Sequence, residues 1–264
     1  MRFFIALFFI HRVDTLTDNL RSRVGSATHT PCAHHIAGED CKFCSIRLIS
    51  VCSALEPDEW ASLEQLASDV SYTEKISFIR EGDESIWVYN VTLGIARLVR
   101  TLPDGRRQLF GFAMPGDFIG LSLGAKWPFS VESITPIKCC RFSRQSFSTF
   151  TDEKPHLLKK MHEFATHELS LARDHMMLLG RLTAEEKIAA FIWRMRQRWA
   201  RVEGHAKSNV PLPMSRQDIA DYLGLTIETV SRTINHLQRD RKLVIVPDGV
   251  RILITDFFER ISSD

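Results

Sequence analysis

The chain lacks a large excess of charge of either sign, because its 264 residues carry a formal net charge of only +2. Its overall field therefore cannot attract nucleic acid, and any such contact requires a local patch of charge. It also lacks a long apolar run, since Phe3–Ile10 is too short to span a bilayer. No small-residue cleavage pattern follows that run. We therefore interpret residues 1–30 as a disordered extension rather than a secretory signal, and we expect no membrane partner.

Cysteine is absent from most of the chain. The six cysteines lie in two short segments, four of them in residues 32–52 and the other two at Cys139 and Cys140. A secreted disulfide scaffold spreads its cysteines more evenly, and a chain of this length has no need of one. The distribution favours a reducing cytoplasm in which the thiolates are available to a metal.

Residues 70–142 lack helical periodicity. Short runs of β-branched and aromatic residues alternate there with glycines, as in Ile76–Ile79 and Ile95–Val99. Asp104-Gly105, between two such runs, predicts a hairpin. Short strands with turns at a spacing of about eight to twelve residues favour a β-barrel or jelly roll.

Residues 155–181 have helical periodicity instead. One face repeats every seven residues, at Leu157, Phe164, Leu171 and Leu178. A neighbouring face carries Leu158, Met161, Ala165, Ala172, Met176 and Leu179. Two apolar faces predict two partners, and the seven-residue repeat favours a second copy of this helix over a second contact within one subunit. Asp174 predicts a weak pairing, because two carboxylates near a dimer axis repel each other.

Residues 215–238 have the spacing of a helix-turn-helix. Gly224 suits a left-handed turn between two helices, and Thr226 is the predicted cap of the second helix. The capping box Thr183-Ala-Glu-Glu186 begins the preceding helix. Residues 243–254 read as a hairpin, which makes the module a winged helix.

The first two turns of the second helix enter the major groove in such motifs. They carry Glu228, Thr229, Ser231 and Arg232, and Arg216 lies at the start of the first helix. Arg232 can donate to O6 and N7 of guanine, and Glu228 can accept from a cytosine amine. We therefore predict binding to double-stranded DNA. The alternative is a winged helix that contacts only proteins.

Cys41, Cys44 and Cys52 form the pattern C-x2-C-x7-C. Thiolates at this spacing suit an iron–sulfur cluster or tetrahedral zinc. Both need a fourth ligand, which Cys139 or Cys140 at the end of a strand can supply. Three alternatives stay open: a redox pair of Cys41 and Cys44, plain structural thiols, and a zinc site that includes Cys32, His34 and His35.

From Cys41 to Leu253 the chain resembles the superfamily of the cyclic-AMP receptor protein and FNR transcription regulators. The motifs that carry the resemblance are Pro115-Gly-Asp-Phe-Ile-Gly120, Ala184-Glu-Glu-Lys-Ile-Ala-Ala-Phe-Ile192 and Ile219-Ala-Asp-Tyr-Leu-Gly-Leu-Thr-Ile-Glu-Thr-Val-Ser-Arg232. Its cysteines are similar to those of the oxygen-sensing FNR branch, of the FnrN type. After Gly120 the chain lacks the Glu and the Arg-Ser pair that hold ribose and phosphate in cyclic-AMP sensors, so we expect no nucleotide ligand.

The resemblance implies a cofactor, a DNA target and partners. The ligands of a [4Fe–4S] cluster would be Cys41, Cys44, Cys52 and Cys140, with Cys140 preferred to Cys139. The contacts to palindromic DNA with TTGAT half-sites would be Glu228, Ser231 and Arg232. The homodimer seam would include Phe164, Leu171, Asp174 and Leu178. The hairpin Leu102–Arg107 would contact RNA polymerase, although a solvated turn explains its sequence as well. The gap of seven residues before Cys52 is longer than the five of enteric FNR proteins.

The sequence thus predicts an α+β protein. It comprises an N-terminal double-stranded β-helix (a jelly roll of the cyclic-nucleotide-binding type), a long dimerisation helix and a C-terminal winged helix-turn-helix. The predicted boundaries are 1–30 for the extension, 31–54 for the cysteine-rich segment, 55–150 for the roll, 153–181 for the helix and 183–264 for the DNA-binding domain. We expect no enzyme, because no Ser/His/Asp or paired-carboxylate arrangement is present.

We hypothesise an oxygen- or redox-responsive regulator of anaerobic or microaerobic genes. With little oxygen, the N-terminal segment is tied to the roll through the cluster, which favours pairing of the 155–181 helices. On this view, Asp174→Ala gives a dimer that is active in air. The alternative is a cluster-free or zinc-containing member of the family that acts constitutively or through thiol redox chemistry.

Overall fold

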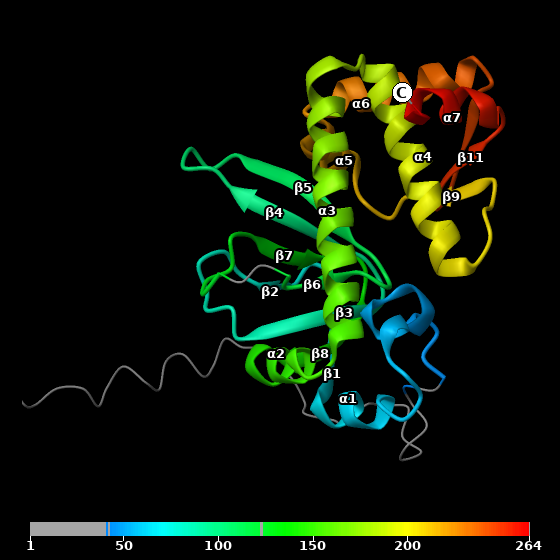
Figure 1. The fold of residues 1–264 in the computed structure, drawn as a ribbon. Coiled ribbons are helices and arrows are strands. Elements are labelled where there is room, and N and C mark those ends of the chain that lie inside the picture. The colour runs from blue at the N-terminus through cyan, green and yellow to red at the C-terminus, as the bar shows by residue number, and fades with distance from the viewer. Residues whose placement is uncertain (1–40, 42, 122–123, 264) are drawn as a thin grey trace, which may run out of the picture.

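The computed structural model describes residues 41, 43–121 and 124–263. The predicted extension lies outside the described residues, as do Cys32, His34 and His35. In the described part, a two-sheet roll is followed by a long helix and a helical domain with a small sheet (Figure 1). This confirms the predicted α+β fold. No helix in this part is both long and apolar enough to cross a membrane.

The roll consists of two four-stranded antiparallel sheets. The first sheet has the order β1-β8-β3-β6, with bounds Ala67–Tyr72, Ile137–Ser143, Trp87–Leu93 and Phe118–Ile119. The second has the order β2-β7-β4-β5, with bounds Ser77–Ile79, Ser130–Ser133, Ala96–Thr101 and Arg107–Ala113. Most neighbouring strands are distant in sequence, as in a jelly roll.

Glycines make two of the tight turns in the roll. Gly105 has a φ of 83° and its N–H donates to the Leu102 carbonyl at 2.9 Å, which confirms the hairpin predicted at Asp104-Gly105. Gly94, between β3 and β4, also has a φ of 83°. A Cβ atom at Gly94 would lie 2.2 Å from the Pro136 carbonyl oxygen. Only glycine fits that position.

The roll has two apolar layers, because successive side chains of a strand point to opposite faces of its sheet. Val91 and Val131 are buried between the two sheets. Val88, Phe118 and Phe142 lie on the outer face of the first sheet, in a second buried cluster. Most of the rest of that cluster comes from η2 (Val51–Ala54), Leu55, α1 (Trp60–Leu66), α2 (Arg144–Asp152) and Leu157. The short helix η1 (Arg47–Ile49) precedes η2.

Helix α1 begins only at Trp60, although apolar residues at helical spacing start at Leu55. A turn precedes it, in which the N–H of Glu59 donates to the Glu56 carbonyl at 3.0 Å. Pro57 explains the delay, because a proline disfavours a helical conformation of the residue before it. Helix α2 is not among the elements predicted from the sequence.

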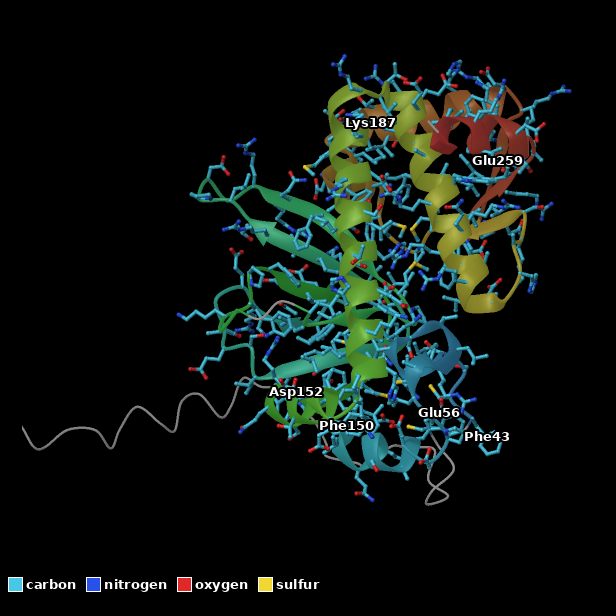
Figure 2. The ribbon with its side chains drawn as sticks, in the orientation of Figure 1. Phe43, Glu56, Phe150, Asp152, Lys187 and Glu259 are labelled. Atoms are coloured by element: carbon cyan, nitrogen blue, oxygen red, sulfur yellow. The ribbon has the colours of Figure 1, made fainter. Side chains whose placement is uncertain are left out.

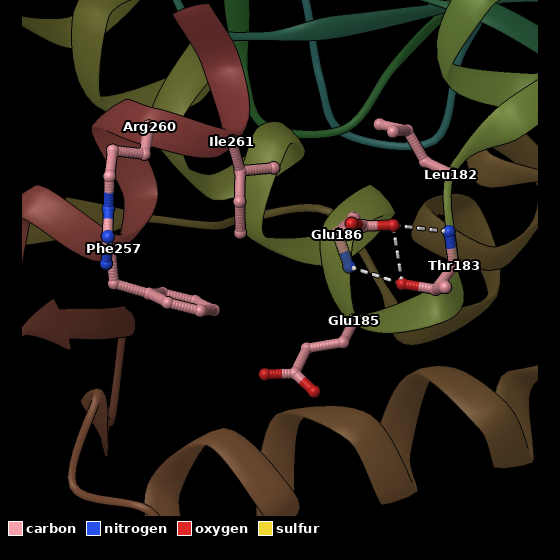
Figure 3. A pocket seen from close by; sticks show the side chains of 7 residues that line it. All are labelled: Leu182, Thr183, Glu185, Glu186, Phe257, Arg260 and Ile261. Atoms are coloured by element: carbon pink, nitrogen blue, oxygen red, sulfur yellow. Dashed lines mark hydrogen bonds between the residues drawn. The ribbon is translucent and has the colours of Figure 1, made fainter. Parts of the chain in front are cut away.

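The long helix α3 has the predicted bounds, Pro155–Arg181. It runs past both the roll and the C-terminal domain (Figure 1). The next helix, α4 (Ala184–Glu203), begins with the predicted capping box (Figure 3). There the Glu186 N–H donates to Thr183 Oγ1 at 3.3 Å, and the Thr183 N–H donates to Glu186 Oε2 at 2.8 Å.

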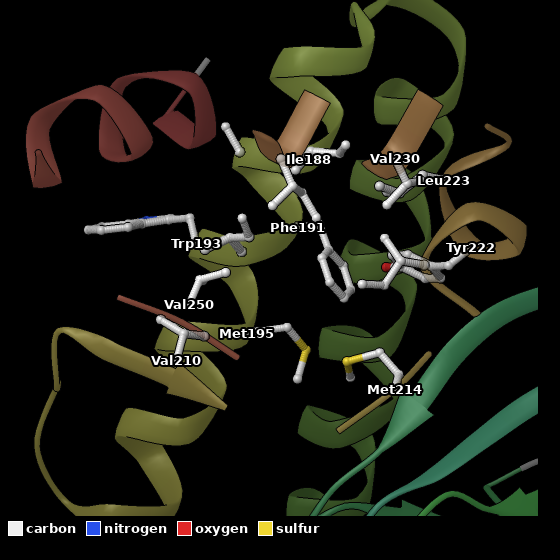
Figure 4. Packing of buried hydrophobic residues seen from close by; sticks show 14 of the residues in the cluster. Ile188, Phe191, Trp193, Met195, Val210, Met214, Tyr222, Leu223, Val230 and Val250 are labelled. Carbon is white, nitrogen blue, oxygen red and sulfur yellow. The ribbon is translucent and has the colours of Figure 1, made fainter. Parts of the chain in front are cut away.

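The C-terminal domain contains the remaining elements: β9 (Asn209–Pro211), α5 (Arg216–Leu223), α6 (Ile227–Arg239), β10 (Leu243–Val246), β11 (Gly249–Ile252) and α7 (Thr255–Ser263). Strands β10 and β11 confirm the predicted hairpin, and β9 adds a third strand in the order β10-β11-β9. The core of this domain includes Phe191, Leu223 and Val230 (Figure 4) and continues to Leu109 and Phe112 of the roll. The two domains therefore share one apolar core.

An ion pair joins the turn before α1 to the start of α3, and it makes stability depend on pH. Glu59 lies 2.8 Å from Lys154 Nζ and 2.8 Å from His156 Nε2. Chiefly the hydrogen bond from Lys154 lowers the pKa of Glu59 to about 2. A carboxyl group whose pKa is depressed by folding stabilises the native state above its unfolded pKa of about 4.3, and this contribution is lost as the pH falls toward the folded value.

We therefore expect Glu59→Gln to lower the denaturant midpoint at pH 7 and to have a smaller effect at pH 3. Urea unfolding of both proteins at the two pH values measures the difference. The exposed neighbour Asp58→Asn is the matched control, with a smaller effect at pH 7. An effect of Glu59→Gln that is equal at both pH values contradicts this role of the ion pair.

Candidate DNA interface and cysteine site

Helices α5 and α6 form the predicted helix-turn-helix. Helix α5 ends at Leu223, and Gly224 follows with a φ of 62°, a left-handed conformation that favours glycine. The hydroxyl of Thr226 accepts from the Thr229 N–H at 3.2 Å and caps α6. The turn and the cap predicted from the sequence are both confirmed.

Helix α6 buries one side and exposes the other. Val230, Ile234 and Leu237 are buried in the domain core. The exposed side carries Glu228, Arg232, Asn235, Gln238 and Arg239, and the last four line an open groove. Thr229 and Ser231 are half-buried. The predicted contacts Glu228 and Arg232 are thus accessible to a DNA major groove.

Two charged residues of the predicted interface differ in their environment. The backbone N–H of Glu228 and the hydroxyl of Thr226 hold the pKa of the Glu228 carboxyl below its usual range, so it is ionised at neutral pH and can accept hydrogen bonds. Arg216 begins α5 and is half-buried, and burial lowers the pKa of its guanidinium. Arg216 is therefore less accessible to DNA than Arg232.

Polar contacts hold the first helix of the motif against the roll and against α3. Arg97 on β4 bridges Glu132 on β7 and Asp218 on α5, with N–O distances of 2.8 Å in both ion pairs. His175 on α3 donates from Nε2 to the Tyr222 carbonyl at 2.9 Å. These contacts fix the orientation of α5 and, through the short turn, that of α6.

Cys41, Cys44 and Cys52 lie in one N-terminal segment beside the start of α3 (Figure 1). The Cys44 carbonyl accepts from the Arg47 N–H at 3.2 Å, and Arg47 Nη1 donates to the Cys41 carbonyl at 3.5 Å. The Arg47 guanidinium also lies 3.8 Å from the centroid of the Trp60 ring. Phe43 is exposed at the outer end of the segment (Figure 2). Arg47 thus anchors the segment to α1.

The Asn90 side chain contacts Cys52, and its strand neighbour Cys140 has its sulfur 3.8 Å from Asp69 Oδ1. The β3–β8 register places Asn90 directly opposite Cys140. Asn90 is 1% exposed, and its Nδ2 donates to Cys52 Sγ at 3.8 Å. Both cysteines pack half-buried against the outer apolar cluster of the first sheet. Burial raises the pKa of the Cys52 thiol to about 11. One buried amide therefore lies between a cysteine of the N-terminal segment and a cysteine of the roll.

Strand alternation separates the two adjacent cysteines of β8. Cys139 is 1% exposed and packs between the two sheets. Cys140 faces the other side, toward the cluster that also contains Cys52. Both residues lie in the middle of β8, rather than at a strand end as predicted. A group held by the N-terminal segment can therefore reach Cys140, whereas reaching Cys139 requires opening the core.

A zinc ion and a [4Fe–4S] cluster require different separations of their sulfur ligands. In the described ranges, no three His, Cys, Asp or Glu side chains are close enough to hold a single metal ion. Zinc requires its sulfurs within about 4 Å of one another, given a Zn–S bond of about 2.3 Å. In a [4Fe–4S] cluster each thiolate binds a different iron atom, so wider separation is tolerated.

The Asn90 side chain also has a buried polar atom that lacks a partner among the residues that are described. Its Oδ1 atom is buried without a hydrogen-bond partner in the part of the chain that the structure describes. A buried unsatisfied oxygen costs about 1–3 kcal/mol. Such atoms are rare in native cores. Oδ1 is an acceptor and an iron–sulfur cluster offers it no donor, so the fit of Asn90 to a cluster rests on its Nδ2 donor, which meets Cys52.

The residues of the predicted dimer seam on α3 differ in exposure within one subunit, and their pairing with a second copy stays a prediction. Leu157 is 1% exposed and Leu178 is 4% exposed, and both pack within their own subunit. Phe164 and Leu171 are half-buried. Asp174 follows Ala165 by nine residues, or about two and a half turns, so it lies on the opposite side of the helix from that residue. Its carboxylate lies 4.0 Å from Arg194 of the same subunit. Asp174 is exposed, and the expectation for Asp174→Ala stays a prediction.

The neighbouring face of α3 is exposed except at Met161, which is half-buried against the outer cluster of the first sheet. We call the row Leu158, Met161, Ala165, Leu169, Ala172, Met176 and Leu179 the α3 stripe. Leu158 is 53% exposed, Leu169 is 52% exposed and Met176 is 64% exposed. These residues recur at helical spacing over most of α3, so they form one continuous apolar surface. The sequence predicts an apolar face at all of these positions except Leu169.

Two family models match this chain. A model of the cyclic nucleotide-binding domain matches residues 69–154, which cover the roll from β1 to α2. A model of bacterial regulatory proteins of the crp family matches residues 212–242, which cover the helix-turn-helix.

Full-length relatives agree with both matches. The transcriptional activatory protein AadR of Rhodopseudomonas palustris is 49% identical over 83% of this chain and 92% of that protein. The nitrogen fixation regulation protein FixK of Bradyrhizobium diazoefficiens is 47% identical over 82% of this chain and 91% of that protein. The solved structure of FixK2 from Bradyrhizobium japonicum matches with a TM-score of 0.67 and 32% identity, over 74% of this chain and 96% of that one. The chain therefore belongs to the CRP/FNR family of transcription regulators, which makes it a DNA-binding regulator and not an enzyme.

Proposed function

We propose that this chain is an oxygen-responsive transcription activator in the cytoplasm, and that it binds palindromic DNA with TTGAT half-sites as a homodimer. We further propose that Cys41, Cys44, Cys52 and Cys140 hold a [4Fe–4S] cluster that controls it. The observation that carries the proposal is that Cys52 and Cys140 pack against the same apolar cluster on the outer face of the first sheet, next to Asn90. The activator name of AadR supports the direction of regulation. When bound, the cluster supplies an oxygen-labile link between the N-terminal segment and β8.

The N-terminal segment also contacts the DNA-binding domain. The side chain of Ile49 packs over Gly116, where a Cβ atom would lie 3.0 Å from Ile49 Cδ1. Arg201 of α4 donates to the Ile49 carbonyl at 3.5 Å. The adjacent Asp117 accepts a hydrogen bond from Arg198, also on α4. Movement of the segment therefore removes contacts that hold α4, the helix on which the recognition motif packs.

The α3 stripe supplies the surface for a second copy of this chain. Val51 and Leu55 of the N-terminal segment share an apolar cluster with Leu157 at the start of α3. The position of the segment therefore biases the position of α3. A difference of a few kcal/mol in the free energy of association suffices to shift the equilibrium between monomer and dimer from mostly monomer to mostly dimer. The dimer then places two α6 helices about 34 Å apart, which is one turn of DNA.

Aromatic rings fill the interior of the roll. Tyr72 stacks on Phe78 at 4.6 Å between centroids, and the contacts continue through Tyr89, Trp127 and Phe129. This packing supports control by a ligand other than a nucleotide. The exposed tip of the β4–β5 hairpin, Leu102–Arg107, extends away from the body of the roll (Figure 1) and is our proposed contact with RNA polymerase.

We expect anaerobically prepared protein to be brown, to contain iron and sulfide and to bleach in air. Cys140→Ala should lose most of the iron, because Cys140 faces Cys52. The matched control Cys139→Ala should retain iron, although its core is less stable because a buried side chain is truncated. Iron and sulfide assays on both variants measure this.

Colourless wild-type protein that contains zinc instead supports the alternative, a zinc-containing regulator. Wild-type protein without either metal supports regulation through the thiols alone. Equal loss of iron in the two variants contradicts the assignment of Cys140.

For the DNA interface, we expect Arg232→Ala to weaken operator binding by about 1–3 kcal/mol and to relax the preference at one base pair. Titration with operators substituted one base pair at a time, at fixed salt, measures this under anaerobic conditions. Arg260→Ala on α7 is the control and should leave the base preference unchanged. An Arg232→Ala variant that weakens binding to all sequences equally shows a phosphate contact instead.

For the dimer, we expect Met176→Glu to raise the dimer dissociation constant by at least about tenfold, because the dimer buries an unpaired charge there. Sedimentation equilibrium of the anaerobic protein measures this. Ser170→Glu adds the same charge at an exposed position on another side of α3 and should leave the dimer intact. If Met176→Glu associates as tightly as wild type, the α3 stripe is not the dimer surface.

A further inference from the structure

We propose that Asn90 is a positioning residue that donates a hydrogen bond to the thiolate of Cys52 and thereby sets the reduction potential and the oxygen sensitivity of the cluster. This inference rests on the proposed function and deepens it. It concerns a side chain of the roll that lies outside the cysteine pattern. The sequence pattern gives no indication of this role, because Asn90 lies within a strand among apolar residues.

The first argument is the place of Asn90 in the sheet. It lies on β3, directly opposite Cys140 of β8, which in turn lies opposite Asp69 of β1. The neighbours Tyr89 and Val91 point between the sheets, so alternation directs Asn90 to the outer face. A row of polar side chains thus crosses the face that the N-terminal segment covers.

The second argument is the hydrogen bond itself. Asn90 Nδ2 lies 3.8 Å from Cys52 Sγ, within the range of hydrogen bonds to sulfur. Asn90 is 1% exposed, so this bond does not compete with water. A hydrogen bond from a fixed donor withdraws electron density from a ligand sulfur, and such bonds are among the factors that set the potential of iron–sulfur centres.

The third argument is the cost of keeping an amide at this position. Asn90 Oδ1 is buried without a partner in the described residues, although an apolar residue here would leave no such atom. The side chain therefore contributes little to the stability of the roll. A role for the N–H donor at Cys52 explains why an amide is present.

The test uses full-length, anaerobically prepared protein. Asn90→Leu removes the donor without adding charge, and Asn90→Ala removes it with a smaller side chain that is also uncharged. Both should lower the midpoint potential of the cluster, because the thiolate becomes more electron-rich. Both should also increase the rate of bleaching in air by about tenfold, the scale on which supporting hydrogen bonds act at metal sites. Potentiometry and the loss of visible absorbance are the two readouts.

The matched control is Ser133→Ala, on the second sheet. Ser133 is also 1% exposed, and its hydroxyl accepts from the Ile76 N–H at 2.9 Å. Its loss should lower stability but leave the potential and the bleaching rate unchanged. If Asn90→Leu does not fold, as judged by circular dichroism, Asn90→Ala decides the question.

Two results overturn the inference, and they are distinguishable. If wild-type protein binds the cluster and a folded Asn90 variant matches its potential and bleaching rate, the inference fails and the proposed function stands. If anaerobic wild-type protein contains no iron, the proposed function and the inference fail together.

Discussion

The pairing of β8 between β1 and β3 is the constraint on which the cysteine site depends. Each strand turns alternate side chains to opposite faces, so the register decides which of the two adjacent cysteines meets the N-terminal segment. A slip of one residue exchanges Cys139 and Cys140. Val70 and Val91, buried between the sheets on either side of β8, make such a slip costly. The apolar interior of the roll thus fixes the position of the chemistry on its outer face.

Helix α3 connects that face to the DNA-binding domain. Its first turn carries Leu157, which packs in the cluster that also contains Val51 of the N-terminal segment. Its last turns carry Leu178, which packs in the core of the DNA-binding domain. The α3 stripe lies on a third side and is exposed. One rigid element is therefore in contact with both functional regions and also presents a free apolar surface.

The contacts between the roll and the DNA-binding domain are of two kinds. A continuous core joins Phe112 of β5 to Tyr222 of α5, with ring centroids 5.4 Å apart. Ion pairs such as Arg97 with Asp218 lie at the edge of this core. Partly exposed ion pairs contribute little net stability, whereas they restrict orientation. Small rearrangements at the N-terminal segment can therefore alter the polar contacts of α4 while the shared core persists.

The resemblance that the sequence motifs carry was enough to identify the family and the order of the domains. The comparisons confirm the family, and the structure confirms the winged helix-turn-helix. The cysteine pattern indicated a metal centre, but it left the fourth ligand open. The seven-residue repeat predicted a seam on α3 that includes Leu157 and Leu178, which are buried within one subunit. A seven-residue repeat marks an apolar face but does not say which partner covers it.

What the sequence alone determined is local. The bounds of α3, the capping box at Thr183, the left-handed Gly224 and the hairpin at Gly105 each depend on a few consecutive residues. Only the tertiary structure decided which cysteine of β8 faces the N-terminal segment, which side of α3 is exposed and that Asn90 lies beside Cys52. Those features depend on strand register and on packing between residues far apart in the chain, such as the 38 positions that separate Cys52 from Asn90. No local pattern encodes such a separation.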